Sequence, residues 1–335
     1  MNSKLISLDQ RAASGEVDNN TTLDDIMHEC GLDFDIELST VHTVEGDEIP
    51  KSRLIRRTDT RDVLSVVGNG YHVVSNMDML EPFDRLRKTY GGVYESAGLI
   101  NNGRQCWVSA SLPDTFKLKE RPADEIQKRI MVLINHTGMG RNSYLSIAHR
   151  IVCNNQMNLI SRAASQSRYR VRHSTTWEHQ LLDAELGFSN ALSLSKEFES
   201  NANVLNSFKM TENQMRGFVH MLLPFVPTPG VKKDKKVSEK MEQKLSRLDS
   251  KRDEIIRLFS QGSGNLGDTR WDALNAVTEF LDHREVKYKD PEVANKKMRS
   301  RFVSNVINGS GDRLKQKAMT ILLDSSNIKG VKSYA

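Results

Sequence analysis

The hydrophobic pattern of this 335-residue chain changes at about Thr176, and this change limits the folds available to it. From Phe34 to about residue 175, short alternating segments are separated by Gly, Asn and Pro, which predicts strands and hairpins. Beyond that point apolar residues recur at helical spacing in long charged segments. Strands followed by helices are typical of an α+β protein. We therefore predict an N-terminal sheet with hairpins and a packed helix, followed by a mostly helical C-terminal half.

Local signals predict several turns and helix starts. The Asn-Asn-Gly sequence at 101–103 lies between two alternating runs and predicts a hairpin, because Asn and Gly tolerate positive φ. Ser75 is a predicted N-cap, and Thr22 and Thr211 fit the capping-box pattern. Around residues 150–156 we expect a strand to pass into a helix.

Charge composition and the positions of proline and glycine divide the chain into four predicted regions. We expect residues 1–33 to form an acidic, partly flexible arm, and residues 1–50 hold 2 Lys/Arg against 12 Asp/Glu. Residues 34–226 form an α+β core domain with a basic groove. A linker follows at 227–237, where proline and glycine precede a lysine cluster, and residues 238–335 form a helical C-terminal region.

The charge distribution is uneven although the net charge is only +5. Residues 126–177 contain no acidic residue in 52 positions and carry eight Lys/Arg. A dense basic field without carboxylates is what a polyanionic partner selects. A solvated basic face with no partner would have the same composition.

Basic residues in and near this window alternate with aromatic and amide residues. Arg168, Arg170 and Arg172 would share one face of an extended strand, where they could follow phosphates while Tyr169 stacks on a base. The side-chain amides of Asn154, Asn155 and Gln156 could form hydrogen bonds with the backbone or the base edges of a nucleic acid. The predicted nucleic-acid-binding residues are Arg104, Lys128, Arg141, His149, Arg150, Asn154, Asn155, Gln156, Arg168, Tyr169, Arg170 and Arg172.

Motifs of several other protein classes are absent from the sequence. There is no phosphate-binding GxxxxGK[ST] loop, no HExxH and no GxSxG, so we expect no enzyme, no catalytic residue and no cofactor. The three cysteines lack metal-ligand spacing, so no metal site is expected. No apolar run reaches about 18 residues and no apolar leader precedes residue 20, which favours a cytoplasmic protein without a membrane partner.

Four segments carry a resemblance to a known family: ESAGLINNGRQCWVSASLP at 95–113, NHTGMGRNSYLSIAHRIVCNNQMNLI at 135–160, RHSTTWEHQLLDA at 172–184 and WDALNAVTEFLDH at 271–283. The chain resembles the phage/plasmid-like domain-of-unknown-function family 932 over roughly residues 50–325. AHRIVCNNQ and RHS are the most specific elements. The resemblance implies the biology of phages, plasmids and other mobile elements. The order of elements is also similar to that of single-strand-annealing recombinases, in which a sheet and a helix line a basic groove.

The sequence thus predicts a protein that binds single-stranded DNA or another nucleic acid, as a DNA-annealing or recombination accessory factor of a mobile element. Homo-oligomers are common among annealing proteins, so self-association is expected from the resemblance. Two alternatives remain open: a protein-interaction or regulatory factor, for example against host defence, and a nuclease-like enzyme whose dispersed carboxylates converge near His136 or His149.

Overall fold

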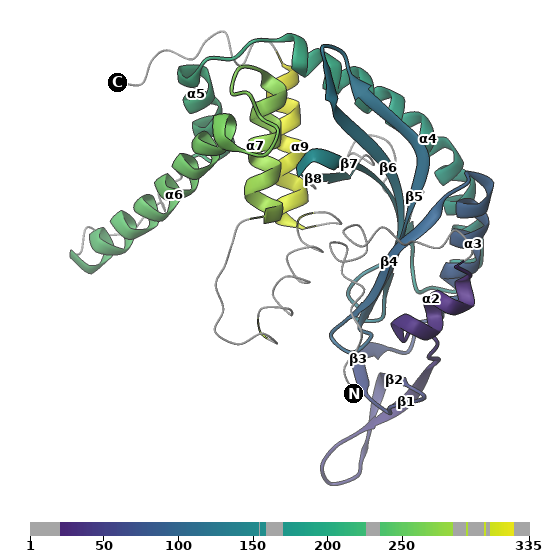
Figure 1. The fold of residues 1–335 in the computed structure, drawn as a ribbon. Coiled ribbons are helices and arrows are strands. Elements are labelled where there is room, and N and C mark those ends of the chain that lie inside the picture. The colour runs from purple at the N-terminus through teal and green to yellow at the C-terminus, as the bar shows by residue number, and fades with distance from the viewer. Residues whose placement is uncertain are drawn as a thin grey trace. The chain divides into compact units, whose positions relative to one another are not determined.

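The computed structural model describes residues 21–153, 155–158, 170–225, 235–283, 293, 305 and 309–324 (Figure 1). The chain divides into two units, each assembled from three segments. Unit 1 comprises Met1–Thr115, Gln127–Ala148 and Asn158–Lys196, and unit 2 comprises Phe116–Ile126, His149–Met157 and Glu197–Ala335. Most of the predicted arm at 1–33 and most of the predicted linker at 227–237 lie outside the described residues.

Unit 1 contains a three-stranded antiparallel sheet near its N-terminal end. The sheet has the order β1 (Ile36–His42), β2 (Glu48–Arg57), β3 (Val63–Gly68). Ile55 in the central strand lies opposite Leu38 and Ser65 and is fully buried, so this position fixes which face of the sheet packs inward.

A larger antiparallel sheet begins in unit 1. Its order is β4 (Val93–Ile100), β5 (Gln105–Leu118), β6 (Arg121–Asn135), β7 (Asn142–Arg150), β8 (Asn155–Asn158), and β9 (Arg170–Val171) pairs with the start of β7. The predicted hairpin at 101–103 is confirmed as the β4–β5 turn. Its three residues have φ angles of 51°, 59° and 95°, which is why Asn and Gly occupy them.

Helices α2 (Leu23–Cys30) and α3 (Asn76–Thr89) and the first part of α4 (Trp177–Ser207) complete unit 1. The predicted caps are confirmed, because Thr22 and Ser75 each form a full capping box with an aspartate three residues on. The hydrophobic core joins side chains from all of these elements. It includes Ile26, Phe83, Tyr94, Ile130, Val132, Tyr144 and Phe188, and Ile130 and Val132 alternate along β6, so both face this core.

Unit 2 is mostly helical, with α5 (Glu212–Leu222), α6 (Lys235–Gln261), α7 (Arg270–His283) and α9 (Ser310–Leu323). The predicted α+β class, with the helices concentrated in the C-terminal half, is confirmed. The helix expected after residue 150 is wrong: residues 151–153 form one 3₁₀ turn and β8 follows. Within the described part of the chain, none of the helices combines the length and hydrophobicity that crossing a membrane requires.

Candidate nucleic-acid interface

One end of the larger sheet gathers arginines from three separate segments of unit 1. The β4–β5 turn and the β6–β7 turn lie at this end, and the backbone N–H of His136 donates to the carbonyl of Arg104 at 2.8 Å. Asn142 lies opposite Val171 in the β7–β9 pair, so the antiparallel register places Arg141 across from Arg172. The fold therefore brings Arg104, Arg141 and Arg172 together, and we call these three residues the basic edge.

The basic edge carries charge that the protein does not neutralise. Arg104 and Arg172 are exposed and Arg141 is half-buried. None of the three side chains forms an ion pair with any residue that the structure describes. Val171 is fully buried and anchors β9, so the alternation of a strand directs Arg170 and Arg172 away from the core. The basic edge can therefore offer guanidinium groups to an anion.

Aromatic rings lie next to the basic edge. Tyr71 stacks on His173, with ring centroids 4.5 Å apart and an angle of 14° between the planes. The ring centroids of His136 and His173 are 6.5 Å apart. Nε2 of His136 lies 2.9 Å from Asn76 Oδ1, within hydrogen-bond distance. Burial lowers the pKa of His136 to about 3 and also lowers the pKa of His173, so both rings are neutral at pH 7. The charge at this end of the sheet comes from arginine.

Two other cations of the acid-free window, both on β6, are neutralised by carboxylates from β5 and β4. Lys128 is buried and pairs with Asp114, and Arg129 Nη2 donates to Glu95 at 2.6 Å. These acids lie outside the window in sequence but beside it in the sheet. A window without acids in sequence is therefore not free of acids in space.

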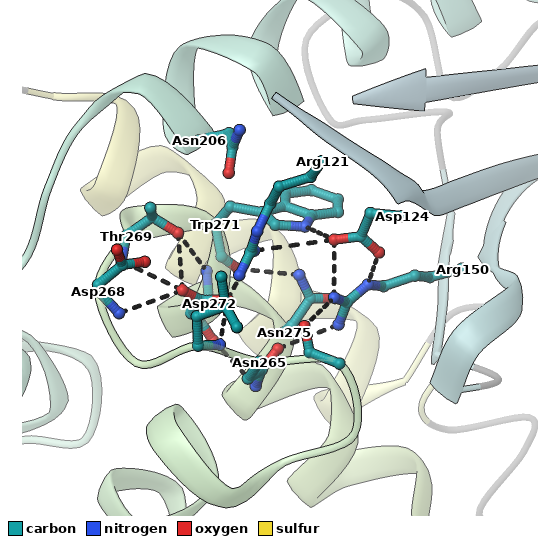
Figure 2. A network of polar contacts seen from close by, with 12 residues as sticks. Arg121, Asp124, Arg150, Asn206, Asn265, Asp268, Thr269, Trp271, Asp272 and Asn275 are labelled. Atoms are coloured by element: carbon teal, nitrogen blue, oxygen red, sulfur yellow. Dashed lines mark hydrogen bonds and ion pairs between the residues drawn. The ribbon is translucent and has the colours of Figure 1, made fainter. Parts of the chain in front are cut away.

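Arg150 lies in a buried polar network of unit 2, shown in Figure 2. Its Nη2 donates to Asp124 at 2.7 Å, its Nε also contacts that carboxylate, and Nη2 donates to the carbonyl of Gly264 at 2.8 Å. Nη1 donates to Asn265 Oδ1 at 3.0 Å. Each nitrogen of the guanidinium has a partner within the protein, so Arg150 contributes to packing and leaves no open face for a phosphate.

The same network includes a second arginine–aspartate pair. Arg121 Nη1 donates to Asp272 at 2.8 Å and lies 3.8 Å from Asp124 (Figure 2). Trp271 Nε1 donates to Asp124 at 2.9 Å, and Thr269 contributes its hydroxyl to Asp272 at 2.9 Å. Two arginines and two aspartates balance in charge, which is how buried ions are accommodated in a protein interior. Within unit 2, the network joins the first residues of β6 and the last residue of β7 to helix α7.

The predicted amide residues are also used internally. Asn155 is buried and its amide donates to the carbonyl of Asn275 at 3.3 Å. The backbone of Gln156 is held on both sides: its N–H donates to Asp282 at 3.1 Å, and its carbonyl accepts from Lys315 Nζ at 2.6 Å.

His149 is buried as well, and Arg170 is half-buried in β9. Asn154, Arg168 and Tyr169 lie outside the described residues. Nucleic-acid binding by the twelve predicted residues stays a prediction. The structure brings three of them together at the basic edge and places Lys128, His149, Arg150, Asn155 and Gln156 in the interior.

The described residues contain no group of three or more His, Cys, Asp or Glu side chains that could hold a metal ion. Burial raises the pKa of the Cys153 thiol to about 11, and the Cys106 thiol is shifted in the same direction. Both thiols are therefore protonated at neutral pH, which does not suit a nucleophile.

No pattern in the sequence indicates the contact between Tyr71 and His173, because their positions differ by 102.

The chain matches the family described as "Domain of unknown function (DUF932)" over residues 63–304. This match covers 242 residues, more than half of the chain, so the protein belongs to that family. No curated protein and no solved structure matches the chain. The expected similarity to single-strand-annealing recombinases is therefore not supported by any comparison.

Proposed function

We propose that this protein binds single-stranded nucleic acid at the basic edge and acts without catalysis, as an accessory factor of a phage or other mobile element. One observation carries the proposal. Arg104, Arg141 and Arg172 come from three segments to one end of a sheet and remain without ion pairs among the described residues. Other cations of the acid-free window, such as Lys128 and Arg129, are paired.

The chemistry of the basic edge suits a flexible polyanion. Guanidinium groups bind phosphate through paired N–H donors, and each contact releases counterions from the nucleic acid. The half-buried rings of Tyr71 and His173 stack on each other beside these charges, and their outer edges are the aromatic groups closest to a bound strand in this proposal. Single strands expose their bases to such rings, whereas a duplex does not. This combination favours a single strand over a duplex.

Binding of this kind is sufficient for an annealing factor. Strands that are held extended, with their phosphates neutralised and their bases accessible, can pair without any bond being made or broken. Assembly into homo-oligomers would extend the basic edge along a longer strand. Annealing and oligomer formation are part of this proposal, together with the role in mobile elements that the family resemblance implies.

The proposal is tested by fluorescence anisotropy with a labelled oligothymidylate at low salt. The triple variant Arg104→Gln, Arg141→Gln, Arg172→Gln should bind at least about tenfold more weakly, because it loses about three phosphate contacts. The matched control Lys244→Gln, Arg247→Gln, Arg313→Gln removes three exposed cations from α6 and α9. It should bind within about twofold of the parent. Equal effects in the two triple variants would contradict the proposal.

A further inference from the structure

Unit 1 carries an acidic pocket at the start of α2, beside the segment that leads into β1. The cavity has a volume of about 360 Å³, and three carboxylates line it: Asp24, Asp33 and Asp35. All three residues are exposed. Asp33 lies 3.3 Å from His28, while Asp24 and Asp35 form no ion pair with any residue that the structure describes. The mouth of the pocket therefore carries negative charge that is not neutralised.

The remaining lining of the pocket is mainly apolar. Met27 and Phe34 are buried beneath it, and Met77 is partly exposed at its side. Asn76 also lines the pocket, but its amide N–H already donates to the carbonyl of Leu32 at 2.9 Å. An apolar floor below a ring of carboxylates fits an arginine side chain, which has an aliphatic stem and a cationic end.

The acidic pocket and the basic edge are neighbours on the same unit. The β4–β5 turn packs on Phe34, since a Cβ at Gly103 would lie 2.8 Å from the Phe34 ring. Arg57 reinforces this contact: it lies over the Phe34 ring at 3.9 Å, and its Nη1 donates to the carbonyl of Asn102 at 3.2 Å. Arg104 follows in the same turn. Phe34 thus separates the pocket from the first arginine of the basic edge.

Two adjacent patches of opposite charge form a self-complementary surface. A two-fold axis between them places the acidic pocket of each copy against the basic edge of the other, and both contacts form at once. Like-charged patches are kept apart in the same arrangement, which selects this orientation over others.

We infer that the acidic pocket docks the basic edge of a second copy of this chain, giving a two-fold dimer. In this dimer the arginines face carboxylates, so the dimer and the nucleic-acid complex exclude each other. The competition rests on the proposed function, whereas the dimer itself does not. Nucleic acid would separate the copies by replacing Asp24, Asp33 and Asp35 with phosphates.

Charge reversal gives a direct test by sedimentation velocity of the full chain. The pocket variant is Asp33→Lys, Asp35→Lys, and the edge variant is Arg104→Glu, Arg172→Glu. Each variant alone presents like charges to itself and should be monomeric. An equimolar mixture pairs the basic pocket with the acidic edge, and the reverse, so it should form dimers at the protein concentration at which the parent does.

The control variant Glu45→Lys, Asp47→Lys makes the same change of charge at exposed positions of the β1–β2 turn, outside the pocket. It should dimerise as the parent does, and raising the salt should dissociate both. Circular dichroism verifies that each variant is folded. If the pocket variant or the edge variant is unfolded, the single substitutions Asp35→Lys and Arg172→Glu replace them. The two single variants are then measured alone and as an equimolar mixture.

A monomeric parent at low salt would overturn the inference, and so would a mixture that stays monomeric. Dimerisation of the pocket variant alone would also overturn it. An oligothymidylate long enough for only one basic edge should convert the parent dimer into a monomeric complex, and the pocket variant should still bind the strand. A dimer that ignores the strand would count against the competition and the proposed function. Strand binding by a monomeric parent would count against the dimer alone.

Discussion

Removing the carboxylate of Asp124 should destabilise unit 2 more than removing any exposed acid. This carboxylate accepts two bonds from Arg150, accepts one from Trp271 Nε1 at 2.9 Å, and lies 3.8 Å from Arg121. The side chains of Arg150 and Asp124 are only 3% and 5% exposed. In the variant Asp124→Ala, the positive charge of Arg150 stays buried with neutral acceptors only.

Breaking a buried ion pair by removing one partner costs about 3–5 kcal/mol, because the remaining charge is desolvated without compensation. One kcal/mol corresponds to about 2–4 °C in melting temperature for a cooperative unit of 150–250 residues. We therefore expect Asp124→Ala to lower the melting temperature of unit 2 by about 10 °C. Adding Arg150→Met should recover part of the loss, because the unpaired charge is then removed.

Urea unfolding followed by circular dichroism measures the change. The control is Glu212→Ala, which removes an exposed ion pair between residues one helical turn apart, Glu212 and Arg216. Such pairs contribute about 0–1 kcal/mol. A loss below about 1 kcal/mol for Asp124→Ala, similar to that of the control, would refute the structural role of the network.

Three further effects are expected. Lys315→Ala should destabilise the chain by about 3–5 kcal/mol in urea unfolding, because Lys315 is fully buried and paired, and a value near zero would contradict that pairing. Gly98→Ala should cost about 1–3 kcal/mol by thermal unfolding, because the added Cβ would lie 2.4 Å from the Trp107 ring. The free energy of unfolding should fall as the pH drops from about 6.5 towards about 3, by up to about 1.4 kcal/mol per unit from His136, because its pKa is depressed in the folded state and the unfolded chain binds the extra proton. Urea titrations across this range should show a shallower dependence for His136→Gln, and an unchanged slope would contradict the effect.

Local chemistry made several elements predictable. Thr22, Ser75 and Thr211 each begin a helix with a capping box, because a hydroxyl at the N-cap and an acceptor three residues later satisfy free N–H groups within a few residues of sequence. The turn at 101–103 follows from the φ angles that Asn and Gly tolerate. Short-range interactions determine such features, so the sequence is sufficient for them.

The role of the basic residues depended on pairing between distant strands. Arg150 and Asp124 are separated by 26 residues, and Arg121 and Asp272 by 151. No periodicity in the sequence indicates that these side chains meet. The short strand β8 could not be predicted for the same reason, because its backbone is held by Asp282 and Lys315 from two later helices.

The basic edge was only partly predictable. Residue type, and the lack of acids in the sequence around Arg141 and Arg172, predict Arg104, Arg141 and Arg172 as binding residues. Their separation from the paired cations required the sheet register, which sets Arg141 across from Arg172. The ring of Tyr71 beside His173 required the tertiary fold.

We propose that the basic edge holds phosphates, and this predicts a specific dependence of binding on salt concentration. The logarithm of the association constant for oligothymidylate is measured against the logarithm of salt concentration, for the parent and for the triple variant Arg104→Gln, Arg141→Gln, Arg172→Gln. Each phosphate contact to a single strand contributes about −0.7 to the slope, so the variant should have a slope shallower by about 2. Equal slopes for the two proteins would contradict the account.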